Sequence, residues 1–106
     1  MARVLITMPA EARRGEIIEI RCLIAHPMET GYRTGDDGKR LTRNIIRRFR
    51  CFFGGELVFS AELFPAVAAN PLISFWLRAS ESGELRFSWE GDEGFSQVET
   101  RVLTVT

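Results

Sequence analysis

The segment "IIRRFRCFFGGELVFSAE", residues 45–62, contains two runs of alternating apolar residues on either side of Gly54-Gly55. Alternation with a period of two is typical of a β-strand that has one buried face. Two glycines between such runs predict a tight hairpin turn, because glycine readily adopts the positive φ angles that these turns need. Arg47 interrupts the apolar face of the first run. The segment therefore predicts two antiparallel strands joined by a two-residue turn.

The same period of two runs through the rest of the chain. Further strands are expected at residues 3–8, 16–25, 72–79, 84–90 and 95–105. Turn signals separate the strands about every 8–12 residues, and no segment has a sustained helical period. The segment "FPAVAANP", residues 64–71, is bounded by prolines and predicts a crossover. The sequence thus predicts an all-β protein, an antiparallel β-sandwich of about seven strands.

Strand parity separates the residues expected in the core from those expected on the outer faces. The inward set is Ile18, Ile20, Cys22, Ile24, Phe49, Cys51, Phe53, Phe75, Leu77, Leu85, Phe87 and Trp89. Large apolar residues are also expected to point outward, namely Ile46, Phe52, Leu72, Trp76 and Leu103. A Trp and a Phe on an exposed sheet face indicate a protein interface, unless a loop or the crossover covers them.

Length and composition indicate one ordinary globular domain, residues 1–106. The chain is 45% hydrophobic and 26% charged, and no apolar run approaches the roughly 20 residues of a membrane span. The N-terminal residues are not expected to form a signal peptide. The net charge is zero, but residues 1–50 carry 11 Lys and Arg against 6 Asp and Glu, whereas residues 51–106 carry 3 against 8.

Six cations fall between Lys39 and Arg50. Such a run could neutralise nucleic-acid phosphates. However, its loop part lacks interleaved aromatic residues, the net charge is zero and no nucleic-acid-binding motif is present. We therefore expect a solvated surface, or one that pairs with an acidic protein. The acid pairs Asp36-Asp37 and Asp92-Glu93 lie beside glycines and are expected to be exposed turn residues.

His26, the only histidine, precedes a proline and is expected to end a strand. A catalytic triad would require a nucleophile beside it, and no nucleophile-elbow motif is present. Cys22 and Cys51 match no zinc or redox spacing, and parity directs both inward. Buried free thiols are expected, although a bridge between neighbouring strands is not excluded. An enzyme that uses His26 and a cysteine is kept as an alternative.

Four segments together resemble the Z subunit of the sulfur-oxidation (Sox) carrier complex. They are "ARRGEIIEI" (12–20), "HPMETG" (26–31), "FSAELFPAVAANP" (59–71) and "RASESG" (78–83). The resemblance extends over essentially the whole chain and keeps the order and spacing of these motifs.

The resemblance implies a small immunoglobulin-like β-sandwich that forms a heterodimer with the Y subunit. The Y subunit ends in a Gly-Gly-Cys-Gly-Gly-like arm, and its cysteine covalently carries sulfur intermediates of thiosulfate oxidation. The Z subunit is implied to hold no cofactor or metal and to perform no catalysis. The pair is implied to act in the periplasm, where the Z subunit is exported together with its signal-bearing partner. Neither Cys22 nor Cys51 is expected to replace the carrier cysteine.

Three sets of residues are predicted to form contact surfaces. An apolar patch around Phe52, Leu72 and Trp76 is expected at the partner interface. The motif residues His26, Met28, Glu29 and Thr30 are expected to shape a contact near the partner or its arm. The cations Arg40, Arg43 and Arg47 are expected to attract anionic sulfur species or the acidic surfaces of visiting Sox enzymes. A self-associating sandwich, which pairs through an exposed face or edge strand and forms a homodimer when isolated, is a further alternative.

Overall fold

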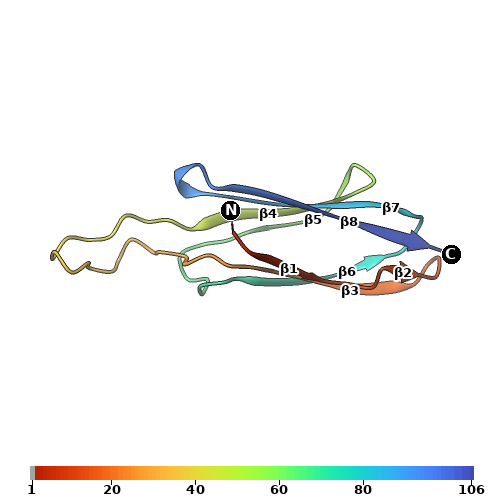
Figure 1. Cartoon of the computed structure of the whole chain (residues 1–106), viewed down its shortest axis with the longest axis horizontal. Helices are drawn as coiled ribbons and strands as arrows, with labels where there is room; N and C mark the ends of the chain where they lie inside the picture. The colour runs from red at the N-terminus through yellow and green to blue at the C-terminus, as the bar shows by residue number, and fades with distance from the viewer. Residues whose placement is uncertain (1) are drawn as a thin grey trace.

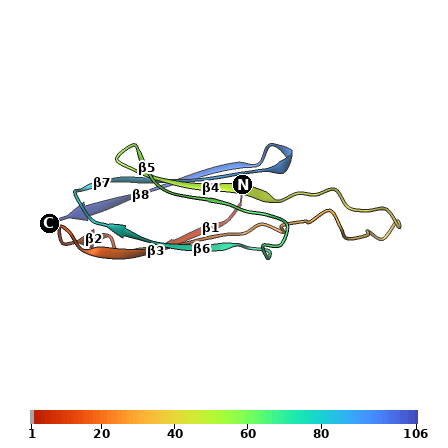
Figure 2. The same ribbon diagram turned by 180° about the vertical axis from the view of Figure 1, so that it is seen from behind.

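The computed structural model describes residues 2–106 and contains two β-sheets packed face to face (Figure 1). Its elements are β1 (Val4–Thr7), β2 (Glu11–Ala12), β3 (Ile17–Ile24), β4 (Ile46–Phe53), β5 (Glu56–Glu62), β6 (Leu72–Arg78), β7 (Gly83–Gly91), the 3₁₀ turn η1 (Asp92–Gly94) and β8 (Ser96–Val105). One sheet has the order β1-β3-β6 and the other the order β2-β8-β7-β4-β5. The view from behind shows the same two layers (Figure 2).

This arrangement confirms the predicted immunoglobulin-like β-sandwich. The additional strand is β2, which has two residues and pairs in parallel with β8. The β4–β5 hairpin is also confirmed. Gly54 and Gly55 have φ angles of 59° and 85°, and positive φ at both central residues is characteristic of the tight turn that suits twisted strands.

Aromatic side chains fill the space between the two sheets. Phe49 of β4 packs against Phe59 and Phe75 at 6.2 Å between ring centroids and against Trp89 at 5.2 Å. Phe75 belongs to the three-stranded sheet, so these contacts join the layers. All of the predicted inward residues are buried except Phe53, which lies partly exposed at the hairpin end of β4.

The prediction that Ile46 points outward is wrong. Ile46 is fully buried, because the register of β4 against β7 shifts between Ile46 and Arg48. The extra residue, Arg47, forms a β-bulge, and with it both Ile45 and Ile46 lie in the core. The interruption of the alternation at Arg47 was the sequence signal of this bulge.

The prediction that Leu103 points outward is also wrong, since Leu103 is fully buried. Along β8 the polar side chains of Gln97 and Glu99 face the inside of the sandwich, whereas Val98 and Val102 are 50% and 68% exposed. Gln97 is satisfied there, because its amide accepts a hydrogen bond from the Ala2 N–H at 3.1 Å and donates one to the Ala2 carbonyl at 3.0 Å. The first half of β8 therefore has polar residues on the inner face, and apolar residues return to that face at Leu103 and Val105.

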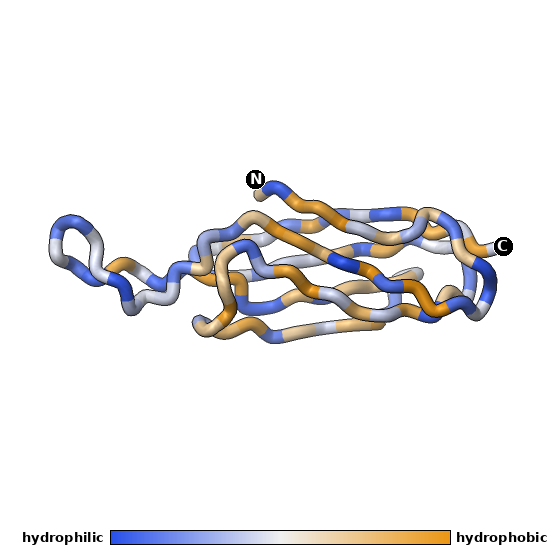
Figure 3. The backbone as a smooth tube through the Cα atoms, turned by 90° about the horizontal axis from the view of Figure 1, so that it is seen from below, coloured by the Kyte–Doolittle hydropathy of each residue, from blue (hydrophilic) through white to orange (hydrophobic). Residues whose placement is uncertain are grey.

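Residues 25–45 form an arm that projects from one end of the sandwich (Figure 1) and is mostly hydrophilic (Figure 3). The arm makes the chain 58 Å long and 20 Å across. Its two legs are joined at the base by reciprocal backbone hydrogen bonds between Glu29 and Asn44, and near the tip by the Leu41 N–H, which donates to the Arg33 carbonyl at 2.8 Å. Residues 25–45 thus form a long, hairpin-like extension.

Gly91 marks the closest approach of β7 to the start of β4. A Cβ atom on Gly91 would lie 2.5 Å from the Ile45 carbonyl oxygen and 2.9 Å from the Ile46 Cα atom. Both of these atoms belong to backbone, which cannot rotate away as the end of a side chain can. Only glycine therefore fits opposite the bulge.

Replacement of Gly91 by alanine should lower the free energy of unfolding by about 1–3 kcal/mol, because the added methyl group overpacks this contact. The control is Thr100→Ala on the exposed face of β8, which should change the free energy by less than about 0.5 kcal/mol. Chemical denaturation measures both values. Equal stability of the two variants would show that the backbone at Gly91 has room for a side chain.

Candidate partner-binding surfaces

His26 lies at the base of the arm and is 5% exposed. Its Nδ1 atom accepts a hydrogen bond from the Met28 N–H at 3.0 Å, and its ring contacts the Phe95 ring edge-on at 4.9 Å. The His26 N–H donates to Asn70 Oδ1 at 2.9 Å, and the Asn70 N–H donates to the His26 carbonyl at 2.7 Å. His26 therefore ties the first leg of the arm to the crossover before β6.

Met28 is 4% exposed and has a φ angle of 51°, in the left-handed region that non-glycine residues seldom adopt. This conformation directs its side chain into the core, where the sulfur accepts the Ile46 N–H at 3.3 Å. The folded chain encloses both side chains, which does not favour direct contact of His26 and Met28 with a partner; this contact stays a prediction.

Glu29 and Thr30 also stabilise the arm itself. Glu29 Oε1 accepts hydrogen bonds from Arg33 Nη2 at 2.6 Å and Nε at 3.2 Å, and these bonds lower the pKa of the Glu29 carboxyl. Thr30 Oγ1 accepts the Tyr32 N–H at 3.2 Å. Both residues are partly exposed, so their contact with a partner stays a prediction.

Asp92 fastens the second leg of the arm to the turn between β7 and β8. Its carboxylate accepts hydrogen bonds from Arg43 Nη2 at 2.9 Å and from the Ile45 N–H at 3.2 Å. It also forms salt bridges with Arg43 Nε at 2.8 Å and Arg47 Nε at 3.2 Å. Burial acts to raise the pKa of Asp92, but the hydrogen bonds and these two positive charges outweigh it and lower the pKa. Asp92 was expected to be an exposed turn acid and is instead a structural clamp.

A groove of about 330 Å³ lies beside this clamp. Its walls include three guanidinium groups and two glutamates above an apolar floor, contributed by Arg43, Ile45, Arg47, Arg48, Glu62, Leu63, Phe64, Pro65 and Glu90. In the strand registers Arg48 lies opposite both Glu62 and Glu90. Two of the nearby acids are already paired, Asp92 with Arg43 and Arg47, and Glu90 with Arg50.

The structure therefore separates the three predicted anion-binding cations. Arg43 and Arg47 share Asp92, whereas Arg40 lies farther out on the arm and is exposed. Contact of these arginines with an anion or an acidic surface stays a prediction, and Arg43 and Arg47 already have a carboxylate partner in Asp92.

Phe52 lies on the outer face of the five-stranded sheet. The Arg86 Cζ atom is 4.4 Å from the centroid of its ring and the Arg50 Cζ atom is 5.8 Å away, so two cations flank the ring. Leu72 and Trp76 belong to β6 of the other sheet. The prediction that the three residues form a single patch is therefore wrong, because they lie on opposite sides of the sandwich.

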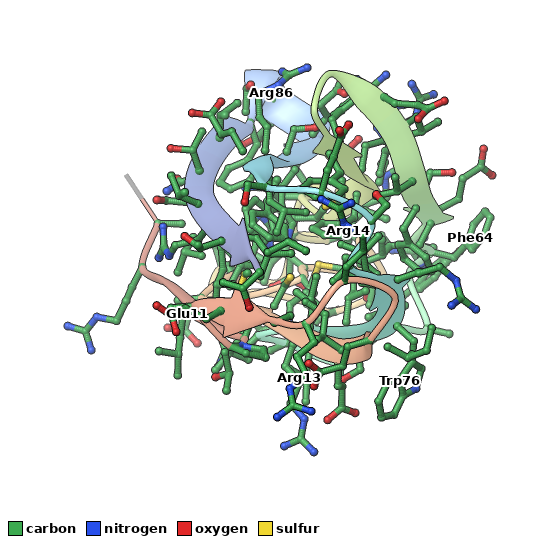
Figure 4. All side chains as sticks on the ribbon, turned by 90° about the vertical axis from the view of Figure 1, so that its right-hand side faces the viewer. Glu11, Arg13, Arg14, Phe64, Trp76 and Arg86 are labelled. Atoms are coloured by element: carbon green, nitrogen blue, oxygen red, sulfur yellow. The ribbon has the colours of Figure 1, made fainter. Side chains whose placement is uncertain are left out.

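Leu72 and Trp76 are 59% and 66% exposed on β6. Figure 4 shows that Trp76 extends away from the body of the molecule, and that Phe64 extends outward from the same flank. No loop or crossover covers these side chains within residues 2–106. Their place in a partner interface stays a prediction.

Cys22 and Cys51 are free thiols with no exposed surface, as expected from their parity. Burial raises the pKa of each thiol to about 12, and the proximity of Cys51 adds to the rise at Cys22. A reactive cysteine requires an accessible thiolate, and neither residue provides one. Among residues 2–106, no three His, Cys, Asp or Glu side chains gather as a metal-binding group. In the same residues no helix is long and apolar enough to cross a membrane.

Solved structures with the same architecture have divergent sequences. A superoxide reductase (neelaredoxin) from Ignicoccus hospitalis superposes with a TM-score of 0.78 over 99% of this chain and 82% of its own, at 17% identity. The sulfur carrier protein SoxY from Chlorobium limicola f thiosulfatophilum superposes with a TM-score of 0.67 over 97% of this chain and 78% of its own, also at 17% identity. At this identity the likeness shows the fold alone. No curated protein sequence matches the chain.

The fold and its surfaces define a small β-sandwich with a buried thiol pair and an exposed apolar strand at one edge. A family model for the sulphur oxidation protein SoxZ matches residues 6–102. The chain therefore belongs to the SoxZ family and is a subunit of the Sox sulfur-oxidation system.

The buried His26 makes stability depend on pH. Burial lowers its pKa from the usual 6.5, although the charge of Asp92 acts in the opposite direction. The unfolded chain then binds a proton more readily than the folded one, so this contribution to stability is complete above pH 6.5 and declines as the pH falls below it. In His26→Asn, whose amide oxygen replaces the Nδ1 acceptor, the unfolding free energy should decline less between pH 7.5 and 5. Parallel pH profiles in denaturant titrations would contradict this assignment.

The buried thiols should resist labelling. At pH 8, Ellman's reagent should modify Cys22 and Cys51 at least about 100-fold more slowly in the folded chain than in guanidinium chloride, because burial suppresses both access and thiolate formation. The unfolded chain, with both thiols exposed, is the matched control. Rapid labelling of either cysteine in the folded chain would instead favour the alternative of a thiol- and histidine-dependent enzyme.

Proposed function

We propose that this chain is the non-catalytic subunit of a heterodimeric sulfur carrier. It scaffolds the Y subunit, whose C-terminal cysteine arm carries sulfur intermediates during thiosulfate oxidation. The observation that carries the proposal is the family match over residues 6–102. The likeness to a solved SoxY is consistent with it in fold, since 97% of this chain superposes on 78% of that carrier.

The chemistry of the chain supports a scaffolding role over an enzymatic one. Cys22 and Cys51 lie in the core, where burial raises their pKa to about 12 and leaves little thiolate. The Nδ1 atom of His26 is already bonded to the Met28 N–H. A sulfur-transfer reaction would need an accessible nucleophile, and the proposal assigns this task to the partner's cysteine.

We further propose that the heterodimer acts in the periplasm and that this chain is exported with its signal-bearing partner. Co-expression with the Y subunit should therefore place both chains in the periplasmic extract. Native mass spectrometry of the purified material should give a 1:1 complex. After exposure to thiosulfate and the remaining Sox enzymes, added sulfur mass should appear on the Y chain.

The control is a Y subunit whose carrier cysteine is replaced by serine. It should still form the 1:1 complex, because scaffolding does not require the thiol, but it should gain no sulfur mass. Sulfur mass on this chain would refute its non-catalytic role. Purification of this chain without the Y subunit would refute the heterodimer, and recovery from the cytoplasm would refute the proposed export.

A further inference from the structure

The outer edge of β6 presents unpaired backbone groups. β6 pairs with β3 alone, and at its two ends the Ile24 N–H donates to the Pro71 carbonyl and the Ala79 N–H to the Glu16 carbonyl. In an antiparallel ladder the backbone groups of alternate residues point to the same side. The N–H and C=O groups of Leu72, Ser74, Trp76 and Arg78 therefore point away from β3, toward the open edge.

The other edge strands are protected against addition of a further strand. β1 has four residues and β2 has two. β5 is longer, but its register against β4 shifts at a bulge and it begins and ends with Glu56 and Glu62. Short strands, bulges and charged residues are the usual devices that prevent edge pairing.

β6 has fewer of these devices, since its one charged residue is Arg78 at its end. Its seven residues, "LISFWLR", follow the β3 register without a shift and contain no proline, lysine or acid. The side chains on the outer face include Leu72 and Trp76, which are 59% and 66% exposed. A long, regular, apolar edge strand is an aggregation hazard unless another strand covers it. The structure thus combines free hydrogen-bonding groups with apolar side chains on one strand.

We propose that β6 is the strand to which an edge strand of the sulfur carrier Y subunit adds, so that the β1-β3-β6 sheet continues into the partner. This inference rests on the proposed function, because the heterodimer supplies the occupant. The added strand satisfies the outward N–H and C=O groups of β6. It carries apolar, uncharged side chains on the face that covers Leu72 and Trp76.

The choice of occupant follows from the architecture of the carrier. The solved SoxY superposes on 97% of this chain, and therefore has a sandwich of the same kind with edge strands of its own. Strand addition between two sandwiches orders little flexible chain, so most of the gain from hydrogen bonding and apolar burial contributes to affinity. A second copy of this chain is the competing occupant, which the experiment below distinguishes.

Amide hydrogen exchange, resolved by residue with NMR, tests the pairing in the free chain and in the complete heterodimer. In the heterodimer the outward amides of Leu72, Ser74, Trp76 and Arg78 should exchange at least about tenfold more slowly. The amides that already face β3, such as Phe75 and Leu77, should change much less. This alternation is the signature of an added strand, whereas a partner lying flat on the sheet would not produce it.

Ser74→Pro supplies an independent test, because proline removes the outward N–H and blocks close approach of another strand. Proline is tolerated where an edge amide faces solvent, so the variant should fold. It should raise the Kd for the Y subunit at least about tenfold. The matched control is Ser60→Pro in β5. The Leu63 N–H donates to the Arg47 carbonyl of β4, so the amides of Leu63, Ala61 and Phe59 point toward β4. The amide of Ser60 therefore points to the open edge of β5. Thermal unfolding of both variants verifies the fold.

Each outcome has a distinct meaning. Alternating protection, with weaker binding by Ser74→Pro only, supports the proposal. A normal wild-type heterodimer that neither protects these amides nor responds to Ser74→Pro overturns the proposal and leaves the proposed function intact. A homodimer of the free chain that Ser74→Pro dissociates, with the heterodimer unaffected, assigns β6 to a second copy and also overturns it. Absence of any wild-type heterodimer refutes the proposed function itself.

Discussion

The packing of Phe49 between the two sheets is the contact on which the sandwich depends. Its ring touches aromatic side chains from β5, β6 and β7, and only β6 belongs to the opposite layer. Phe59 and Phe75 stack on each other at 4.5 Å, and this stack extends the contact across the layers. Because protein interiors are close-packed, the ring fixes the separation of the sheets. The surfaces of β6 and β4 consequently face in opposite directions.

The sequence predicted the strands and the core well, because alternation reports directly on which side chains are buried. It failed where a residue's environment depends on a distant segment. The burial of Ile46 follows from a bulge opposite Gly91, which lies 45 residues away in the chain. Likewise, parity correctly directed Phe52 and Trp76 away from the core, but parity cannot assign two strands to different sheets.

The motif "HPMETG" illustrates the same limit at the candidate site. Its specificity indicated a contact surface, yet its residues mainly build the base of the arm. Met28 enters the core through a positive φ angle, and His26 binds the crossover through Asn70. Asp92 holds the second leg of the arm through its salt bridges with Arg43 and Arg47. Both legs of the arm are therefore hydrogen-bonded, where they leave the sandwich, to segments that are remote in sequence.

The polar residues on the inner face of β8 affect which register this strand adopts in the sheet. A slip of one residue would turn Val98 and Val102 inward and release Gln97 and Glu99 to solvent, but it would also expose Leu103 and Val105. The native ladder is selected by Leu103 and by the two hydrogen bonds between Gln97 and Ala2. The pairing of the last strand is therefore supported by a contact with Ala2, a residue 95 positions earlier in the chain.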